Sequence, residues 1–214
     1  MISIRNIITA IMTVILAQAV PASASIIHLL GPLIYRTGLI VAPAISVSIL
    51  NGPLIAVNQG PFPEIIAKYT DYINSTDTAT DQIDGLVFYT EGGDVPDEVT
   101  YYYQMLAGNQ ISLLNLLRDK AALFTLLPII GQPITALLRD GQRATDALGA
   151  KIVDAVNSDE YAGLNTQIVT SRAAINAAYA RTIQSYDGLI GLKKREGGHQ
   201  DEQKAKREVR MFIA

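Results

Sequence analysis

The sequence predicts an all-α protein, a mainly antiparallel bundle of four to five helices. Three observations predict this class. From Glu64 onward, apolar side chains recur at steps of three and four residues, which is the period of amphipathic helices. No segment shows the strict alternation of apolar and polar residues that is typical of a half-buried strand. The connections between the periodic segments are short, so their apolar stripes must be buried against one another.

The first 24 residues predict a secretory signal peptide. Arg5 gives the segment its positive start, residues 6–20 are an uncharged apolar run, and small side chains occupy positions 22 and 24. Cleavage after Ala24 is favoured, and cleavage after Ala19 is the alternative. We therefore expect a secreted, extracellular protein.

Charge and cysteine content narrow the class of the exported chain. Removal of the signal peptide takes away Arg5, its only charged residue, and changes the formal net charge from −3 to −4. This balance argues against a general role in binding nucleic acid. The chain has no Cys, so its fold must rely on packing rather than disulfides, and thiol catalysis and thiolate metal sites are excluded.

Residues 25–63 predict an apolar leader rich in Pro and Gly. Arg36 is the only formal charge in it, and four prolines recur between residues 32 and 61, too many for one regular helix. Two interpretations stay open. The leader either packs on the domain or is disordered, or residues 37–57 span a membrane, since the segment is long enough and membrane helices tolerate Pro and Gly.

The bundle domain is predicted over residues 64–192. Its first helix runs from Glu64 to the Gly92-Gly93 pair, and its second from about 94–98 to Arg118, with a short continuation to Leu127. Pro128, Gly131 and Pro133 then predict a turn. A third helix follows at 134–156, and a last one runs from the Asn157-Ser158-Asp159 cap to about Leu192.

The tail, residues 193–214, is predicted to be charged and flexible. It holds seven Lys or Arg against four acidic residues. Two dibasic pairs end at Arg195 and Arg207, and such pairs are cleavage sites for kexin-like proteases in secreted precursors. A solvated, charged helix end explains them equally well.

Catalytic machinery is not recognisable in the sequence. The two histidines, His28 and His199, lie in the leader and the tail, outside the predicted bundle. The densest acidic groups fall on a helix surface and at a helix start, which does not favour a metal site. Absence of Trp argues against a glycosidase cleft. We therefore expect a non-enzymatic protein with neither a metal nor a cofactor.

Two polar patterns remain. Tyr101, Tyr102 and Tyr103 form a run on one helix, so at least one must face the core and at least one must face solvent. They are either packing residues or the aromatic rim of an apolar cavity for an amphiphilic ligand. Asn74-Ser75-Thr76 is a sequon for N-glycosylation, and Asn74 lies beside the apolar stripe of its helix.

The helical segments resemble the fungal hydrophobic surface-binding protein and cell-wall galactomannoprotein family. The resemblance rests on residues 73–84, on Ala147-Leu148-Gly149-Ala150-Lys151-Ile152-Val153, and on the later 164–167, Ser171 and 175–178. It implies a secreted helical bundle that adsorbs to hydrophobic surfaces and recruits hydrolases, or that holds fatty acids between its helices and acts in virulence. The apolar leader and the lack of a Ser/Thr-rich tail depart from the family and put permanent wall attachment in doubt.

These observations together predict a secreted, non-enzymatic protein that binds a fatty-acid-like lipid or a hydrophobic surface. The resemblance adds a secreted hydrolase or a cell-wall polysaccharide as further partners. The alternatives are a membrane-anchored extracellular domain and a precursor trimmed at its dibasic pairs. A bundle rich in Leu, Ile and Ala can either pack tightly, which is the more common case for any single residue, or leave a slot for an acyl chain. The candidate lining residues of such a slot are Leu106, Leu138, Leu148, Ile175 and Tyr179.

Overall fold

The computed structural model describes residues 25–47, 60–83, 96–125, 128–156 and 161–213. The side chains of residues 125, 128–132 and 190–213 lie outside this description. The described residues form helices and no strand, which confirms the predicted all-α class. The helices are α2 (Ile26–Ser46), α4 (Pro61–Ile83), α5 (Pro96–Asp119), the short α6 (Ala121–Thr125), α7 (Pro128–Ala155) and α8 (Ala162–Ile213).

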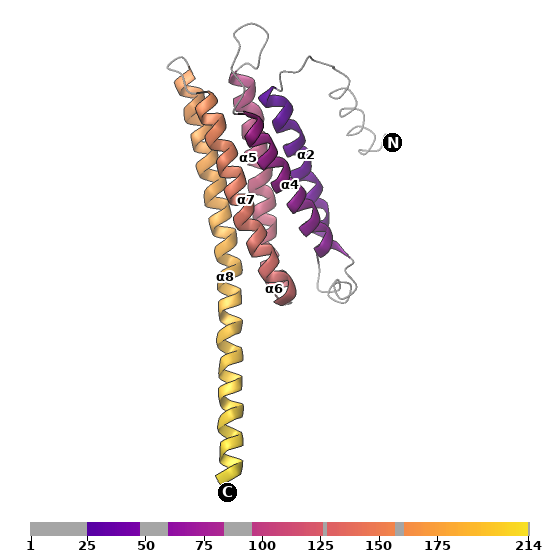
Figure 1. Cartoon of the computed structure of the whole chain (residues 1–214), viewed down its shortest axis with the longest axis vertical. Helices are drawn as coiled ribbons and strands as arrows, with labels where there is room; N and C mark the ends of the chain where they lie inside the picture. Colours follow the sequence, from indigo (N-terminus) through magenta and orange to yellow (C-terminus); the bar gives the residue numbers. More distant parts are fainter. Residues whose placement is uncertain (1–24, 48–59, 84–95, 126–127, 157–160, 214) are drawn as a thin grey trace.

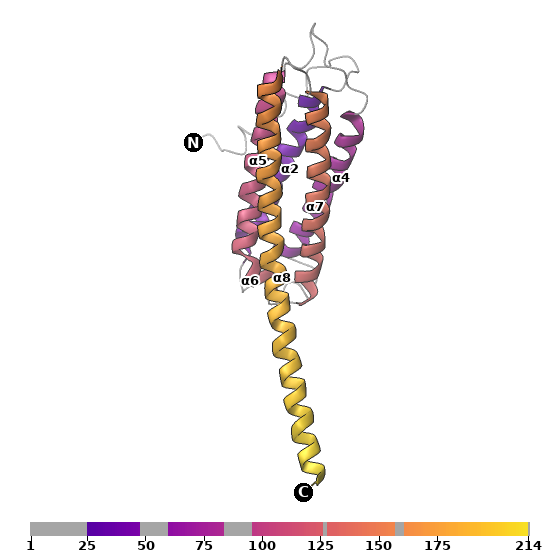
Figure 2. The same ribbon diagram turned by 90° about the vertical axis from the view of Figure 1, so that its left-hand side faces the viewer.

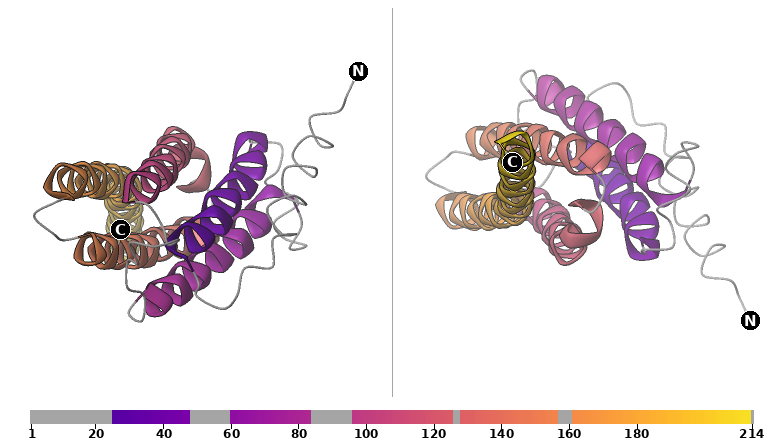
Figure 3. Two further views of the ribbon diagram at one scale, coloured as in Figure 1. Left: turned by 90° about the horizontal axis from the view of Figure 1, so that it is seen from above. Right: turned by 90° about the horizontal axis from the view of Figure 1, so that it is seen from below.

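The five long helices enclose one interior. Helix α2 packs against α4 and α5, α4 packs against α7, α5 packs against α8, and α7 packs against α8. Successive long helices run in opposite directions along the bundle (Figure 1). Seen along the bundle, α2 and α4 lie together on the side opposite α8 (Figure 3). The contacts therefore close a ring of five helices around a single apolar core.

Helix α2 covers only part of the predicted leader, residues 25–63, because it ends at Ser46 and α4 begins at Pro61. It contains Pro32 and Pro43, each of which lacks the N–H that an α-helix uses. The helix forms because its inner face is buried, with Leu30, Leu33 and Ile40 no more than 1% exposed. Burial of large aliphatic side chains contributes about 1.5–3 kcal/mol each, which offsets the missing hydrogen bonds. The bundle thus begins at α2, not at residue 64.

The predicted turn before α7 is also wrong. Helix α7 begins at Pro128, and Pro133 lies inside it. Proline is favourable at the first position of a helix because its fixed φ suits the helix and its missing N–H has no partner there. The later Pro133 is exposed, so its ring meets water on the outer face of the helix.

Helix α8 is longer than its apolar stripe. The stripe predicts an end near Leu192, but the backbone remains helical to Ile213 and extends well beyond the bundle (Figures 1 and 2). The residues that follow Leu192 are mostly Lys, Arg, Glu and Gln, which have high helix propensity. The end of burial is therefore not the end of the helix.

Aromatic packing closes one end of the bundle. The rings of Phe62 and Phe124 meet edge to face with centroids 5.1 Å apart, and Tyr186 lies 6.1 Å from Phe124. These side chains come from α4, α6 and α8, and Figure 2 shows α6 at the lower end of the bundle. The short α6 therefore caps the interior.

Candidate functional site

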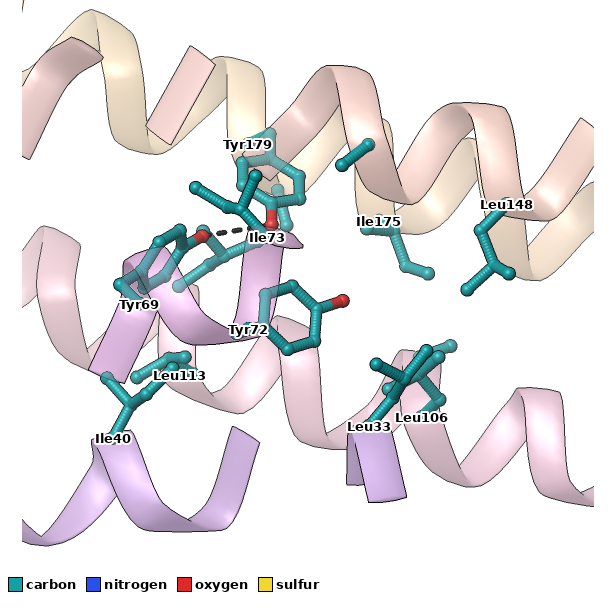
Figure 4. Close-up of a cluster of buried hydrophobic side chains, with 14 of the residues drawn as sticks. Leu33, Ile40, Tyr69, Tyr72, Ile73, Leu106, Leu113, Leu148, Ile175 and Tyr179 are labelled. Carbon is teal, nitrogen blue, oxygen red and sulfur yellow. Dashed lines mark hydrogen bonds between the residues drawn. The ribbon is translucent and has the colours of Figure 1, made fainter. Parts of the chain in front are cut away.

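The five predicted lining residues all lie inside the bundle. Their side chains are between 0% and 2% exposed and belong to one apolar cluster. Figure 4 shows Leu106, Leu148 and Ile175 pointing into the space beside Tyr72, with Leu33 of α2 facing them. The structure gathers these side chains from α5, α7 and α8 and adds Leu33 of α2, which the sequence analysis did not name as a lining residue.

Leu138 lines a different part of the interior. It borders a small apolar cavity of about 10 Å³ together with Ile65, Tyr69, Leu117, Ile134 and Leu137. That volume is about one water molecule, whereas pockets for small organic ligands measure about 300–1,000 Å³. An acyl chain therefore needs more space than this cavity offers.

A network of buried polar side chains crosses the middle of the bundle. The hydroxyl of Tyr69 donates to that of Tyr179 over 2.9 Å, shown as a dashed line in Figure 4. The hydroxyl of Tyr179 donates to Gln110 Oε1 over 3.2 Å. We call the following residues the hydroxyl network, which has members on all five long helices: Thr37, Tyr69, Tyr72, Gln110, Thr145 and Tyr179.

Each hydroxyl proton of the hydroxyl network has an acceptor. Because Tyr179 gives its single proton to Gln110, its contact with Thr145 at 3.4 Å needs Thr145 as the donor. Tyr72 must then donate to Thr145 over 3.1 Å. Gln110 Nε2 donates to Thr37, which donates to the carbonyl of Leu33. The network is thus a closed structural element that joins the helices.

Burial fixes the protonation state of these tyrosines. Loss of water raises the pKa of Tyr69, Tyr72 and Tyr179 above its ordinary value of 10, because an interior of low polarity disfavours the phenolate. The hydroxyl network is therefore neutral at physiological pH. Sequence analysis missed the network because Tyr179 occupies an ordinary stripe position and the pairing of its hydroxyl depends on neighbouring helices.

Tyr103 behaves differently. Its side chain is fully buried. Among the buried side-chain N and O atoms of the described residues, its hydroxyl is the one without a hydrogen-bond partner. Leaving such a group unpaired costs about 1–3 kcal/mol. The neighbours Tyr101 and Tyr102 are exposed and half-buried, so the prediction that the run faces both core and solvent is confirmed.

Glycines on α7 make room for the tyrosine hydroxyls. A Cβ added at Gly141 would lie 2.9 Å from the hydroxyl of Tyr69 and 3.0 Å from that of Tyr179, and one added at Gly149 would collide with the hydroxyl of Tyr103. Gly141, Thr145 and Gly149 stand at intervals of four, so they share one face of α7. That face receives the hydroxyls of both the hydroxyl network and Tyr103.

An ion pair between α7 and α8 lies beside Gly149. Arg172 Nε and Nη2 donate to the two carboxylate oxygens of Asp146 over 2.7 and 2.8 Å, and Asn176 also donates to Asp146. Hydrogen bonds from Arg172 lower the pKa of Asp146, which keeps it ionised. The aliphatic part of Arg172 lies 3.1 Å from the position of a Cβ on Gly149. Arg172 thus shields the region around Tyr103 while its charge is held by Asp146.

The remaining predicted site residues lie elsewhere. Asn74 is exposed on α4, whereas Thr76 of the same sequon is buried and donates to the carbonyl of Tyr72. Ala24 falls outside the described residues, and Arg195 and Arg207 lie in the part of α8 whose side chains are outside them. Glycosylation and processing at these residues stay predictions.

Metal ligands do not gather in the described ranges, where no three His, Cys, Asp or Glu side chains come together. His28 is exposed on α2. A surface hollow of about 360 Å³ between α7 and α8 is bordered by the polar side chains of Arg139, Gln142, Arg143, Asp146 and Asn176. Its arginines are held in ion pairs with acidic residues.

A solved structure shares this fold over most of the chain. The fungal mannoprotein AfMp4p in complex with palmitic acid superposes with a TM-score of 0.63 at 17% sequence identity. The match covers 75% of this chain and 97% of AfMp4p. No protein-family model matches the chain, and no curated protein matches it. The likeness shows a common helical bundle fold.

Proposed function

We propose that this protein is a non-enzymatic binder of fatty-acid-like lipids that takes one acyl chain between its helices. The observation that carries the proposal is the fold shared with AfMp4p, which was solved with palmitic acid and is covered over 97% of its length. Supporting it, the interior beside Leu106, Leu148 and Ile175 is lined by aliphatic side chains from four helices.

Binding requires the helices to separate. The apolar cavity beside Leu138 holds only about 10 Å³, so the acyl chain must displace packed side chains or widen the ring. Helix α2 is suited to move because its two internal prolines remove backbone hydrogen bonds. The hydroxyl network ties α2 to α5 through Thr37 and Gln110, which limits how far the ring opens.

A direct test uses the full chain, stripped of lipid and mixed with palmitic acid. Native mass spectrometry is expected to show one bound palmitate per chain, and palmitate is expected to displace a fluorescent fatty acid. The variant Ile175→Trp fills the interior and should abolish binding. Val169→Trp is the matched control, because Val169 lies on the same helix with its side chain 46% exposed, and it should bind normally. An unliganded wild-type chain at saturating palmitate contradicts the proposal.

We propose that the protein acts outside the cell, in a cell wall or the surrounding medium. The support is the signal-peptide pattern of residues 1–24. N-terminal sequencing of the protein from culture medium should begin at Ser25. Recovery of the protein solely inside cells would contradict this location.

A second candidate function is adsorption to hydrophobic surfaces through α2. Among the described helices, α2 is the one long and apolar enough to cross a membrane by length and composition, a criterion that core helices also meet. Its outward residues Tyr35 and Ile45 are 40% and 61% exposed. The double variant Tyr35→Asp with Ile45→Asp should lose adsorption to oil droplets and retain palmitate binding.

The membrane-anchor alternative concerns residues 37–57, of which 48–57 lie outside the described residues. Residues 37–46 belong to α2, where Ile40 and Ala44 are fully buried in the bundle. This burial favours α2 as a member of the bundle. Alkaline carbonate extraction of membranes decides the question, because a spanning segment would keep the protein in the pellet.

A further inference from the structure

The hydroxyl of Tyr103 stands apart from the other buried tyrosines. Tyr69, Tyr72 and Tyr179 share their protons within the hydroxyl network, and Tyr186 donates to the carbonyl of Leu117 over 3.0 Å. Tyr103 is as deeply buried but gives its proton to no acceptor in the described residues. It is a hydrogen-bond donor inside an apolar interior.

The hydroxyl of Tyr103 lies close to the backbone of α7. Gly149 of α7 carries no side chain, and any Cβ there would collide with the hydroxyl of Tyr103. Apolar side chains stand next to Gly149 and one turn away along α7 and α8, and each is at most 2% exposed: Leu148, Ile152, Ile168 and Ile175. The donor therefore lies beside a stretch of α7 and α8 whose buried side chains are suited to an alkyl chain.

Charge around Tyr103 is balanced. Arg172 and Asp146 are the charged groups that act on its hydroxyl, and they neutralise each other in a two-point ion pair. The group that completes the site therefore has to bring an acceptor oxygen. An amphiphile with an alkyl chain and one terminal oxygen provides both properties that the site requires.

We propose that Tyr103 donates a hydrogen bond to the terminal oxygen of the bound lipid, and so sets the orientation of the acyl chain. This inference rests on the proposed lipid-binding function. The carboxyl of a fatty acid and the hydroxyl of a fatty alcohol have this acceptor in common, whereas an alkane lacks it. The aliphatic chain extends from Tyr103 towards Leu106, Leu148 and Ile175.

The test compares Tyr103→Phe with wild-type protein for palmitic acid, 1-hexadecanol and hexadecane, by displacement of a fluorescent probe from the full chain. Loss of one hydrogen bond is expected to weaken palmitic acid and hexadecanol by about 2- to 10-fold, and to leave hexadecane unchanged. The variant should fold and melt no lower than wild type, because it removes an unpaired polar group.

Tyr186→Phe is the matched control. It also removes one buried tyrosine hydroxyl, but one that donates to the carbonyl of Leu117 near α6. It should lower the melting temperature and bind all three ligands as wild type does. Equal palmitate affinity in wild type and Tyr103→Phe overturns the inference alone. A wild-type chain that binds none of the three ligands overturns both the inference and the proposed function.

Discussion

Two positions on one face of α7 receive tyrosine hydroxyls in opposite ways. At Gly141 the hydroxyls of Tyr69 and Tyr179 meet and are fully paired. At Gly149, two helical turns further on, the hydroxyl of Tyr103 is buried and has no partner among the described residues. The difference shows that the same arrangement, a glycine facing a tyrosine of another helix, can either join helices through a hydrogen bond or leave a buried hydroxyl without an acceptor.

The largest expected effect concerns alkaline pH and all the buried tyrosines. Burial raises the pKa of each above 10 in the folded protein: Tyr69, Tyr72, Tyr103, Tyr179 and Tyr186. Below about pH 10 they are neutral in both states, so pH has no effect through them. Above it the unfolded chain loses these protons while the folded chain keeps them, and unfolding becomes more favourable.

The free energy of unfolding should therefore fall above pH 10, by about 1.4 kcal/mol per pH unit for each buried tyrosine. Urea unfolding at several pH values from about 8 to 11 measures this slope. Tyr103→Phe and Tyr179→Phe should each reduce the slope by one tyrosine. An unchanged slope in either variant would show that its hydroxyl ionises in the folded protein.

The sharpest comparison replaces one hydroxyl at each position. Tyr179→Phe should lower the free energy of unfolding by about 2–4 kcal/mol, because Tyr69, Thr145 and Gln110 all lose a partner. Tyr103→Phe should raise it by about 1 kcal/mol, because no partner is lost. Urea unfolding at pH 7 measures both. Equal losses in the two variants would mean that Tyr103 is paired in solution.

Filling the glycine at each position is the next test. Gly141→Ala places a Cβ 2.8 Å from Tyr69 Cε1, and the overpacking should cost about 1–3 kcal/mol. Gly149→Ala should also be destabilising, but less so in the Tyr103→Phe background, where the colliding hydroxyl is gone. Gly108→Ala is the control, since its Cβ meets open space and should stabilise α5 by about 0.5–1 kcal/mol.

The smallest effect is expected on the outside of the bundle. Arg139 donates to Asp187 over 2.9 Å, but the two side chains are 58% and 47% exposed. Arg139→Gln should change the free energy of unfolding by less than about 1 kcal/mol and leave palmitate affinity unaltered. A larger loss in urea unfolding would show that surface charge, not the interior, ties α7 to α8.

Much of the fold follows from periodicity alone. Stripe residues such as Ile65, Leu113 and Ile168 are buried as their spacing predicts, because helix period and burial are coupled wherever one face of a helix meets a core. Two of the differences from the prediction, the extent of the bundle at α2 and the start of α7, both involve proline. Sequence patterns predict the hydrogen bond that is lost at Pro32 or Pro133. They do not predict the contacts with other helices that compensate for it.

The candidate site divides in the same way. The inward direction of Leu106, Leu148 and Ile175 could be predicted because each belongs to its own helical stripe. The pairing of Tyr179 and the isolation of Tyr103 could not, since the two have the same chemistry and comparable positions on their stripes. Which hydroxyl finds an acceptor depends on how α5, α7 and α8 come together.

The sequence by itself determined an all-α bundle, its inward faces, the signal-peptide pattern and the lack of thiol chemistry, because composition and period are local properties. Only the tertiary structure decided that α2 belongs to the bundle, that six polar side chains join five helices, and that the hydroxyl of Tyr103 finds no partner within the described ranges. These features depend on atoms brought together from distant parts of the chain, where a hydrogen bond or a cavity is made by the packing of helices and not by any one of them.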